Sequence, residues 1–159
     1  MICFNLLGEE KTVLLGEIIA KNINAPILIY LKGDLGAGKT HLSKGIAKGL
    51  GIEEEITSPT FTLINEYEIN DLKFYHLDLY RLDSLNQILD LGIEDFIDND
   101  NSIVLIEWAE KLGNYKLSSN LIEIEVIHKD NSRDFIIDTK EDKYKDILEG
   151  INKIVSSWN

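Results

Sequence analysis

The chain has 159 residues, and this length predicts one domain over residues 1–159 with a core of ordinary size. Hydrophobic residues make up 44% and charged residues 28% of the sequence, as is typical of a soluble globular protein. The formal net charge of −12 argues against a chain that holds RNA, DNA or an anionic membrane by itself, because an acidic surface repels phosphate groups.

The sequence predicts a cytoplasmic protein. Its single cysteine, Cys3, excludes an internal disulfide and fits a reducing compartment, and we expect it to be a small apolar residue of an early strand. No apolar run approaches membrane-spanning length. Glu9, Glu10 and Lys11 interrupt the first apolar stretch, so we expect no signal peptide and no association with a membrane.

Helical and strand patterns alternate along the chain without an internal repeat or a low-complexity linker. In chain order they predict an edge strand at 2–7, a helix at 9–22, a strand at 27–31, a helix at 39–50, a loop at 57–60, strands at 61–68 and 73–79, a helical segment at 84–97 broken at Gly92, a strand at 103–106, a hairpin of strands 121–127 and 133–137, and a helical stripe over 144–158. This order predicts a three-layer α/β fold, with parallel central strands and antiparallel hairpins at the edges.

The most informative motif is a phosphate-binding loop, or Walker A motif, spelled Gly33-Asp34-Leu35-Gly36-Ala37-Gly38-Lys39-Thr40. It follows a predicted strand and opens a predicted helix, as the motif requires. Its glycines let backbone N–H groups turn inward and form an anion site at the helix N-terminus. Lys39 can reach the β- and γ-phosphates, and the Thr40 hydroxyl can bind Mg²⁺. A lysine in the first helical turn opposes the helix dipole unless an anion lies there, so the motif predicts nucleotide binding.

A P-loop binds phosphate, but hydrolysis also needs a metal, a positioned water and charge neutralisation. Glu107 directly follows the apolar run 103–106, which is typical of a strand covered on both faces. Ligands gather at the carboxyl edge of parallel strands, and Mg²⁺ sites with substrate phosphates need only one or two carboxylates. Glu107 is therefore the predicted acidic Mg²⁺ ligand; the alternative is a strand-end carboxylate that faces solvent.

Asp78 is the second carboxylate of interest, because strand alternation places it on one face with His76 and Tyr80. It could bind a metal-bound water or orient the attacking water, or it could form a local ion pair with Arg81. We take Lys39, Asp78 and Glu107 as the candidate catalytic residues.

The loop before Asp78 carries the hydroxyl groups of Thr57, Ser58 and Thr60, and its shape is restrained by Pro59. Such a loop could act as a switch that senses the γ-phosphate and Mg²⁺, or it could simply be a polar turn.

Two further features bear on the nucleotide and its hydrolysis. No N-K-x-D element of guanine-specific GTPases occurs in the sequence, which favours ATP. Arg81 and Arg133 are the only arginines, so an arginine that stabilises the transition state is one of these two or comes from a partner. Slow intrinsic turnover that rises within a complex is therefore a natural hypothesis.

Taken together, four stretches resemble the TsaE (YjeE) family of bacterial P-loop ATPases. They are Gly33 to Thr40, Ser58-Pro59-Thr60-Phe61-Thr62-Leu63, His76-Leu77-Asp78-Leu79-Tyr80-Arg81-Leu82, and Ile106-Glu107-Trp108. The last three stretches make the resemblance specific, because the P-loop alone is shared by a much larger superfamily.

This resemblance implies an ATPase that takes part in making threonylcarbamoyladenosine (t6A) at position 37 of tRNA. It implies Mg²⁺ as cofactor and ATP as substrate, with the TsaD transferase and the TsaB scaffold as partner proteins. The tRNA would then be held mainly by those partners, which fits the acidic charge of this chain.

By position, the resemblance assigns Thr40 and Glu107 as Mg²⁺ ligands and residues 36–41 as the phosphate-contacting stretch. Glu9 and Thr12 fall where the family contacts the nucleotide, and Arg133 falls at a further nucleotide-proximal position. His41 departs from the family, which commonly has a second Thr or Ser there. Its backbone N–H would still reach phosphate, so we expect binding to survive.

Two other classes of function compete with this interpretation. A P-loop kinase for a small metabolite would usually need a lid with several arginines. A nucleotide-dependent interaction module would bind ATP and change its contacts without turnover.

Overall fold

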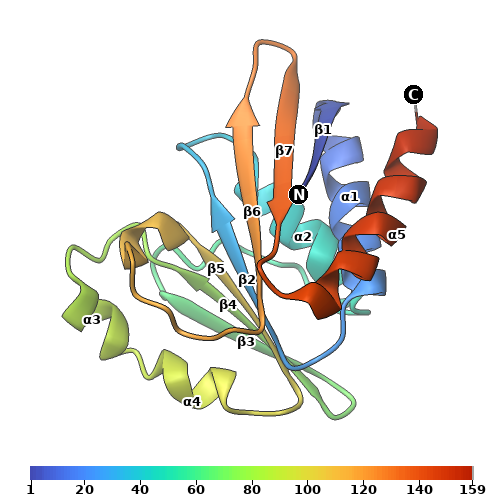
Figure 1. The fold of residues 1–159 in the computed structure, drawn as a ribbon. Helices are drawn as coiled ribbons and strands as arrows, with labels where there is room; N and C mark the ends of the chain where they lie inside the picture. The colour runs from blue at the N-terminus through green and yellow to red at the C-terminus, as the bar shows by residue number, and fades with distance from the viewer. Residues whose placement is uncertain (159) are drawn as a thin grey trace.

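A computed structural model describes residues 1–158 of the chain. Its strands form one mixed sheet in the order β1-β7-β6-β2-β5-β4-β3 (Figure 1). The strands are β1 (Ile2–Leu7), β2 (Ile27–Lys32), β3 (Ile64–Ile69), β4 (Leu72–Asp78), β5 (Ser102–Glu107), β6 (Leu121–His128) and β7 (Ser132–Asp138). The four central strands β6, β2, β5 and β4 are parallel, and the outer pairs β1–β7, β7–β6 and β4–β3 are antiparallel. The predicted parallel centre with antiparallel edge hairpins is therefore confirmed.

Helices lie on both faces of the sheet and make the three layers (Figure 1). One face is covered by α1 (Gly8–Asn22), α2 (Lys39–Gly49) and α5 (Lys145–Val155), and the other by the short helices α3 (Leu85–Leu89) and α4 (Ile93–Ile97). Gly92 separates the two short helices in a left-handed conformation, as the predicted break requires. Within residues 1–158, no helix is both long and apolar enough to cross a membrane.

The strand β5 shows how the core positions the site. Ile103 and Leu105 pack on the α1 and α2 side of the sheet, whereas Val104 and Ile106 pack on the α3 and α4 side. By the same alternation, Glu107 emerges beside α2 at the carboxyl end of the strand. The apolar run therefore serves both core layers and places one carboxylate next to the P-loop helix.

Two sequence-based expectations need correction. The strand predicted at 61–68 begins at Ile64, because residues 61–63 form a turn in which Leu63 has a φ of +67° and donates its N–H to the carbonyl of Pro59. Cys3 lies in the predicted edge strand, but its side chain is exposed instead of packed, because it points away from the face that buries Phe4 and Leu6.

Helix α1 packs so closely on α2 that small residues are required at the contact. A Cβ atom added at Gly45 would lie 2.1 Å from the carbonyl oxygen of Val13, and one at Gly16 would lie 2.5 Å from that of Leu42. These neighbours are backbone atoms, which cannot move aside as a flexible side chain can. The α1–α2 contact therefore fixes the helix that carries the P-loop lysine.

We predict that Gly45→Ala lowers the free energy of unfolding by at least about 1–3 kcal/mol, because the added methyl group overpacks a rigid contact. The matched control is Gly150→Ala in α5, where the nearest atom is the side-chain oxygen of Asn22 at 3.2 Å. There alanine should change stability little or raise it by up to about 1 kcal/mol through helix propensity. Urea unfolding of both variants measures the difference; equal effects would contradict the close-packing account.

Candidate functional site

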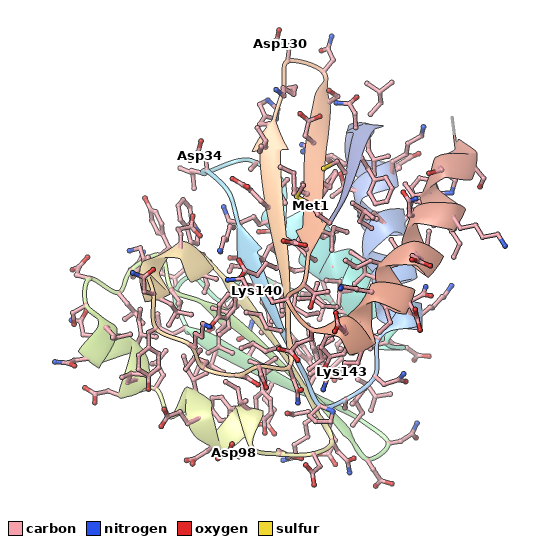
Figure 2. The ribbon with its side chains drawn as sticks, viewed as in Figure 1. Met1, Asp34, Asp98, Asp130, Lys140 and Lys143 are labelled. Carbon is pink, nitrogen blue, oxygen red and sulfur yellow. The ribbon has the colours of Figure 1, made fainter. Side chains whose placement is uncertain are left out.

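The P-loop lies where the sequence predicts it, between the end of β2 and the start of α2. Gly33, Gly36 and Gly38 all have positive φ values, which L side chains rarely adopt. Gly38 is the residue before α2, and a Cβ atom there would also lie 2.6 Å from Nε of Arg133. Asp34 projects from the outer tip of the loop (Figure 2). The N–H groups of the first helical turn lack intrahelical acceptors, so this turn is suited to bind an anion.

The Lys39 side chain is folded back over the P-loop. Its Nζ donates to the carbonyl of Gly33 and, at 2.9 Å, to that of Asp34, and it lies 3.9 Å from the centre of the Trp108 ring. Burial lowers the pKa of Lys39, while the charges of Glu107 and other nearby acids oppose this effect. A buried ammonium group held by neutral carbonyls is poised to exchange them for an anionic phosphate.

Trp108, which covers this lysine, has a strained backbone. Its φ of +59° is a genuine outlier for an aromatic residue. Its ring contacts Lys39 on one side and lies with its centre 5.0 Å from that of the Tyr80 ring. The site therefore includes a tryptophan held in a conformation that its surroundings must stabilise.

Glu107 is a buried carboxylate with two hydrogen-bond donors on one oxygen. Its Oε1 accepts from Ser43 Oγ of α2 at 2.7 Å and from His76 Nε2 of β4 at 2.9 Å. Burial by itself would raise the pKa of Glu107, but the bond and charge of His76, the Ser43 hydroxyl and the Lys39 charge together lower this pKa below its ordinary value. The residue is thus an ionised carboxylate and not the solvent-facing strand end of the alternative interpretation.

Asp78 connects the site to the hydroxyl-rich loop. The register pairs it with Glu107 on the neighbouring parallel strand, so that both carboxylates lie at one edge of the sheet. Its Oδ2 accepts from Thr60 Oγ1 at 2.9 Å, and its Oδ1 accepts from the backbone N–H of Tyr80 at 2.8 Å. The hydroxyl of Thr60 lies 2.7 Å from that of Ser58. The Asp78 side chain is buried and joins the loop to β4.

Arg81, which the sequence offered as an ion-pair partner for Asp78, lies elsewhere. No ion pair joins the two side chains within residues 1–158, and the exposed guanidinium group lies 4.2 Å from the centre of the Phe61 ring. Phe61 is itself 81% exposed. The local ion-pair alternative for Asp78 is therefore wrong.

At the other end of the P-loop, residues far apart in the sequence come together. Arg133 Nε donates to the carbonyl of Ala37 at 2.9 Å, and its Nη2 lies 4.0 Å from Glu9 Oε1. His41 Nε2 lies 3.3 Å from Glu9 Oε2. Glu9, His41 and Arg133, which all belong to the predicted ATP-binding set, thus lie together at one end of the loop. Thr12 is different, because it is fully buried and its hydroxyl donates to the carbonyl of Gly8 within α1.

The residues at the sheet edge suit a hard cation such as Mg²⁺. No described residue donates a hydrogen bond to Oε2 of Glu107, and the half-buried Thr40 hydroxyl likewise has no partner among residues 1–158. Both atoms are oxygen donors of the kind that Mg²⁺ prefers. Across the described residues, no three His, Cys, Asp or Glu side chains form a metal-binding cluster. The chemistry of the available donors therefore fits an ion that also takes ligands from substrate phosphates.

Ser43 and the contact of His76 with Glu107 were not found by sequence reasoning. Ser43 lies one helical turn after Lys39, a spacing that gives no functional signal by itself. Its single hydroxyl proton is shared between Glu107 Oε1 at 2.7 Å and the Lys39 carbonyl at the longer distance of 3.0 Å. In the sequence, His76 stands out as a polar residue on its strand face and as the first residue of the stretch His76 to Leu82, and neither feature indicates a contact with Glu107. The register between β4 and β5, which brings it to Glu107, is set by long-range packing.

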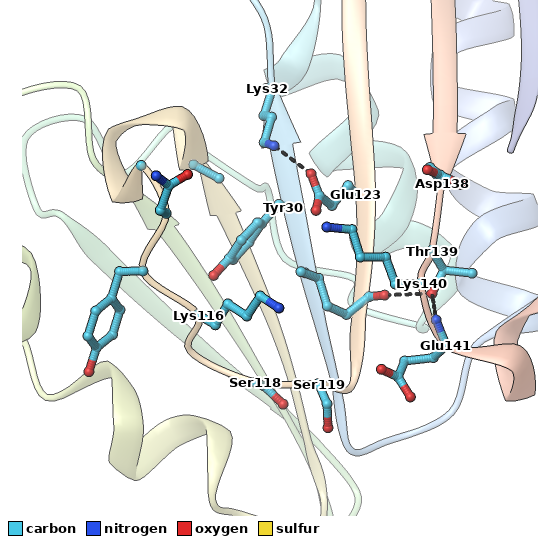
Figure 3. Close-up of a pocket in the computed structure, with 15 residues that line it drawn as sticks. Tyr30, Lys32, Lys116, Ser118, Ser119, Glu123, Asp138, Thr139, Lys140 and Glu141 are labelled. Atoms are coloured by element: carbon cyan, nitrogen blue, oxygen red, sulfur yellow. Dashed lines mark hydrogen bonds and ion pairs between the residues drawn. The ribbon is translucent and has the colours of Figure 1, made fainter.

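A separate cavity of about 690 Å³ lies beside β2 and β6, against the segment 113–119 (Figure 3). Tyr30, Lys32 and Glu123 are among the residues that line it, and Lys32 forms an ion pair with Glu123. None of the predicted site residues lines this cavity. The P-loop edge and this cavity are therefore distinct features.

Comparisons with known proteins agree on one family. The family model described as "Threonylcarbamoyl adenosine biosynthesis protein TsaE" matches residues 6–135. The chain is 47% identical over 117 residues to the tRNA threonylcarbamoyladenosine biosynthesis protein TsaE of Nostoc sp., covering 72% of this chain and 71% of that protein. It is 32% identical over 148 residues to the protein of the same name from Bacillus subtilis, covering 92% and 91%. A crystal structure of Bacillus subtilis YdiB matches with a TM-score of 0.80 at 27% identity, covering 96% of this chain and 95% of that one.

The position of Lys39 against Trp108 predicts an optical signal for nucleotide binding. A phosphate that draws Nζ away from the Trp108 ring should change the tryptophan emission, because a cation at 3.9 Å is removed from the ring face. The chain contains one other tryptophan, Trp158. We expect Trp158→Phe to retain the change on titration with ATP and Trp108→Phe to lose it. The opposite assignment would contradict a movement of Lys39 on binding.

Proposed function

The chain belongs to the TsaE family, and we propose that it is the ATP-binding and ATP-hydrolysing subunit needed to form t6A at position 37 of tRNA. The names of its relatives support the pathway. The observation that carries the ATPase assignment is the convergence, at one sheet edge, of the P-loop with the buried carboxylates of Asp78 and Glu107. A loop that only bound phosphate would not need two buried carboxylates beside it.

Phosphate binding follows from groups already in place. The N–H groups at the start of α2 would hold the β- and γ-phosphate oxygens, and Lys39 would exchange the carbonyls of Gly33 and Asp34 for phosphate. Arg133, fixed on the carbonyl of Ala37, supports the loop from β7 and adds positive charge near the phosphates. Residues 33–41 thus form the proposed ATP-binding stretch, with Glu9 and Arg133 at one end and Thr12 behind it in α1.

Hydrolysis requires the groups on the other side of the loop. Thr40 and Glu107 would hold Mg²⁺, which when bound neutralises charge on the phosphate oxygens. Asp78, at the same sheet edge, would orient the attacking water. Its hydrogen bond to Thr60 links that function to the loop 57–60, which we propose to be a switch that responds to the γ-phosphate.

We further propose that the protein acts in the cytoplasm with TsaD and TsaB. Its net charge of −12 disfavours direct contact with the tRNA backbone, so the partners would hold the tRNA. Exposed Phe61 and Arg81 lie next to the proposed switch loop, where a partner could sense its state. Of the two arginines, Arg133 already contacts the P-loop, and a partner could supply another to the transition state.

The direct test is ATP hydrolysis by the purified chain, alone and with TsaB and TsaD from the same source. We expect slow turnover that rises strongly with the pair. Equal turnover in both cases would contradict activation by the partners and favour a metabolite kinase, which a screen for a phosphorylated acceptor would identify. ATP binding without turnover in either case would favour an interaction module.

Two substitutions should separate binding from hydrolysis. Lys39→Ala should weaken ATP binding about tenfold to a hundredfold, because hydrogen bonds to charged groups contribute about 1.5–3 kcal/mol. Glu107→Gln should lower turnover on the order of 100-fold, or about 3 kcal/mol, while ATP still binds. Calorimetry and steady-state hydrolysis measure these two effects.

The matched controls for these substitutions are Lys44→Ala and Glu149→Gln, which make the same charge changes at exposed positions on α2 and α5. Both controls should remain within about twofold of wild type, since exposed charges contribute little. Normal turnover in Glu107→Gln would overturn its assignment to the metal site.

A further inference from the structure

The two carboxylate oxygens of Glu107 differ in their hydrogen bonds. Ser43 Oγ and His76 Nε2 both donate to Oε1, at 2.7 Å and 2.9 Å, while no described residue donates to Oε2. These donors come from α2, which packs on one face of the sheet, and from β4, the strand paired with β5. Two donors from different elements restrict rotation of the carboxylate and single out one oxygen.

His76 is not explained by packing. The residue is fully buried, and its ring centre lies 6.3 Å from that of Phe74 on the same strand face. Its Nδ1 has no hydrogen-bond partner among residues 1–158, and an unsatisfied buried polar group costs about 1–3 kcal/mol. An apolar ring would fill the space without this cost, so the only evident gain from the imidazole is its bond to Glu107.

We propose that His76 is a positioning residue that, together with Ser43, occupies Oε1 of Glu107 and leaves Oε2 to face the metal ion of the nucleotide. This inference rests on the proposed function and deepens it. His76 does not touch ATP or the ion; it acts through Glu107. Ser43 couples the same carboxylate to α2, one turn after Lys39, so the orientation of Glu107 depends on both the sheet and the P-loop helix.

The consequence is a specific effect on metal binding. Groups that orient a metal ligand through hydrogen bonds typically change metal affinity or activity by about 10–100-fold when they are removed. A group that only fills the core would change stability and leave the metal response intact. The two explanations therefore differ in the Mg²⁺ dependence of nucleotide binding, which can be measured without turnover.

The experiment compares His76→Phe, which keeps a ring but removes the donor, with His76→Gln, whose amide nitrogen restores a donor. Calorimetry would follow ADP binding to each folded variant over a Mg²⁺ titration. We expect His76→Phe to need about 10–100-fold more Mg²⁺ with an unchanged metal-free affinity for ADP, and His76→Gln to recover to within a few-fold of wild type. Ser43→Ala should shift the Mg²⁺ requirement in the same direction.

Ser102→Ala is the matched control for Ser43→Ala, because it also removes a buried hydroxyl. Ser102 begins β5, whereas Glu107 ends it, so the control lies away from the site. It should lower stability and leave the Mg²⁺ requirement unchanged. If His76→Phe does not fold, Ser43→Ala carries the same test, together with nitrogen-15 NMR of the wild-type His76 ring. That spectrum should show a slowly exchanging proton on Nε2 that is lost or shifted in Glu107→Gln.

Each outcome bears on a different claim. An equal Mg²⁺ requirement in wild type, His76→Phe and Ser43→Ala would overturn the positioning inference and leave the ATPase proposal intact. A proton found only on Nδ1 of His76 would also overturn the inference, because Nε2 could then not donate to Glu107. Absence of any Mg²⁺ effect on ADP binding in the wild-type protein would overturn the proposed function and this inference together.

Discussion

The Glu107 carboxylate is a negative charge buried at the carboxyl end of a central strand, and much of the surrounding structure is arranged to stabilise it. An isolated buried charge is very costly unless it is paired and hydrogen-bonded. Ser43 from α2, His76 from β4 and the nearby charge of Lys39 meet this requirement from three directions. The hydrogen bonds and the charge that stabilise the buried carboxylate therefore also hold the P-loop helix against the sheet.

The site has two ends with different properties. At one end, Arg133 and Glu9 hold the P-loop through contacts between β7, α1 and the loop, and the tight α1–α2 packing makes that end rigid. At the other, Asp78 and Thr60 join the sheet edge to the loop 57–60, in which Thr57 and Ser58 are exposed and Pro59 is buried. This contrast fits the proposed division of the site into a phosphate-binding end and a switch loop.

The sequence predicted the features that are local. The glycine spacing located the P-loop, and the apolar run before Glu107 located its strand, because each signal lies within one element. The contacts of Arg133 with Ala37 and of His76 with Glu107 could not be predicted from the residues alone. They depend on strand order and register, which are set by packing across the whole sheet. The family resemblance pointed to Arg133 but did not reveal its contact.

The most direct test of the central claim is a crystal structure with Mg²⁺ and a non-hydrolysable ATP analogue. The account predicts that Lys39 leaves the carbonyls of Gly33 and Asp34 for the phosphates, and that Mg²⁺ lies between Thr40 and Oε2 of Glu107 while Oε1 keeps both donors. An ion bound without Glu107, or a lysine still folded onto the loop carbonyls, would contradict it.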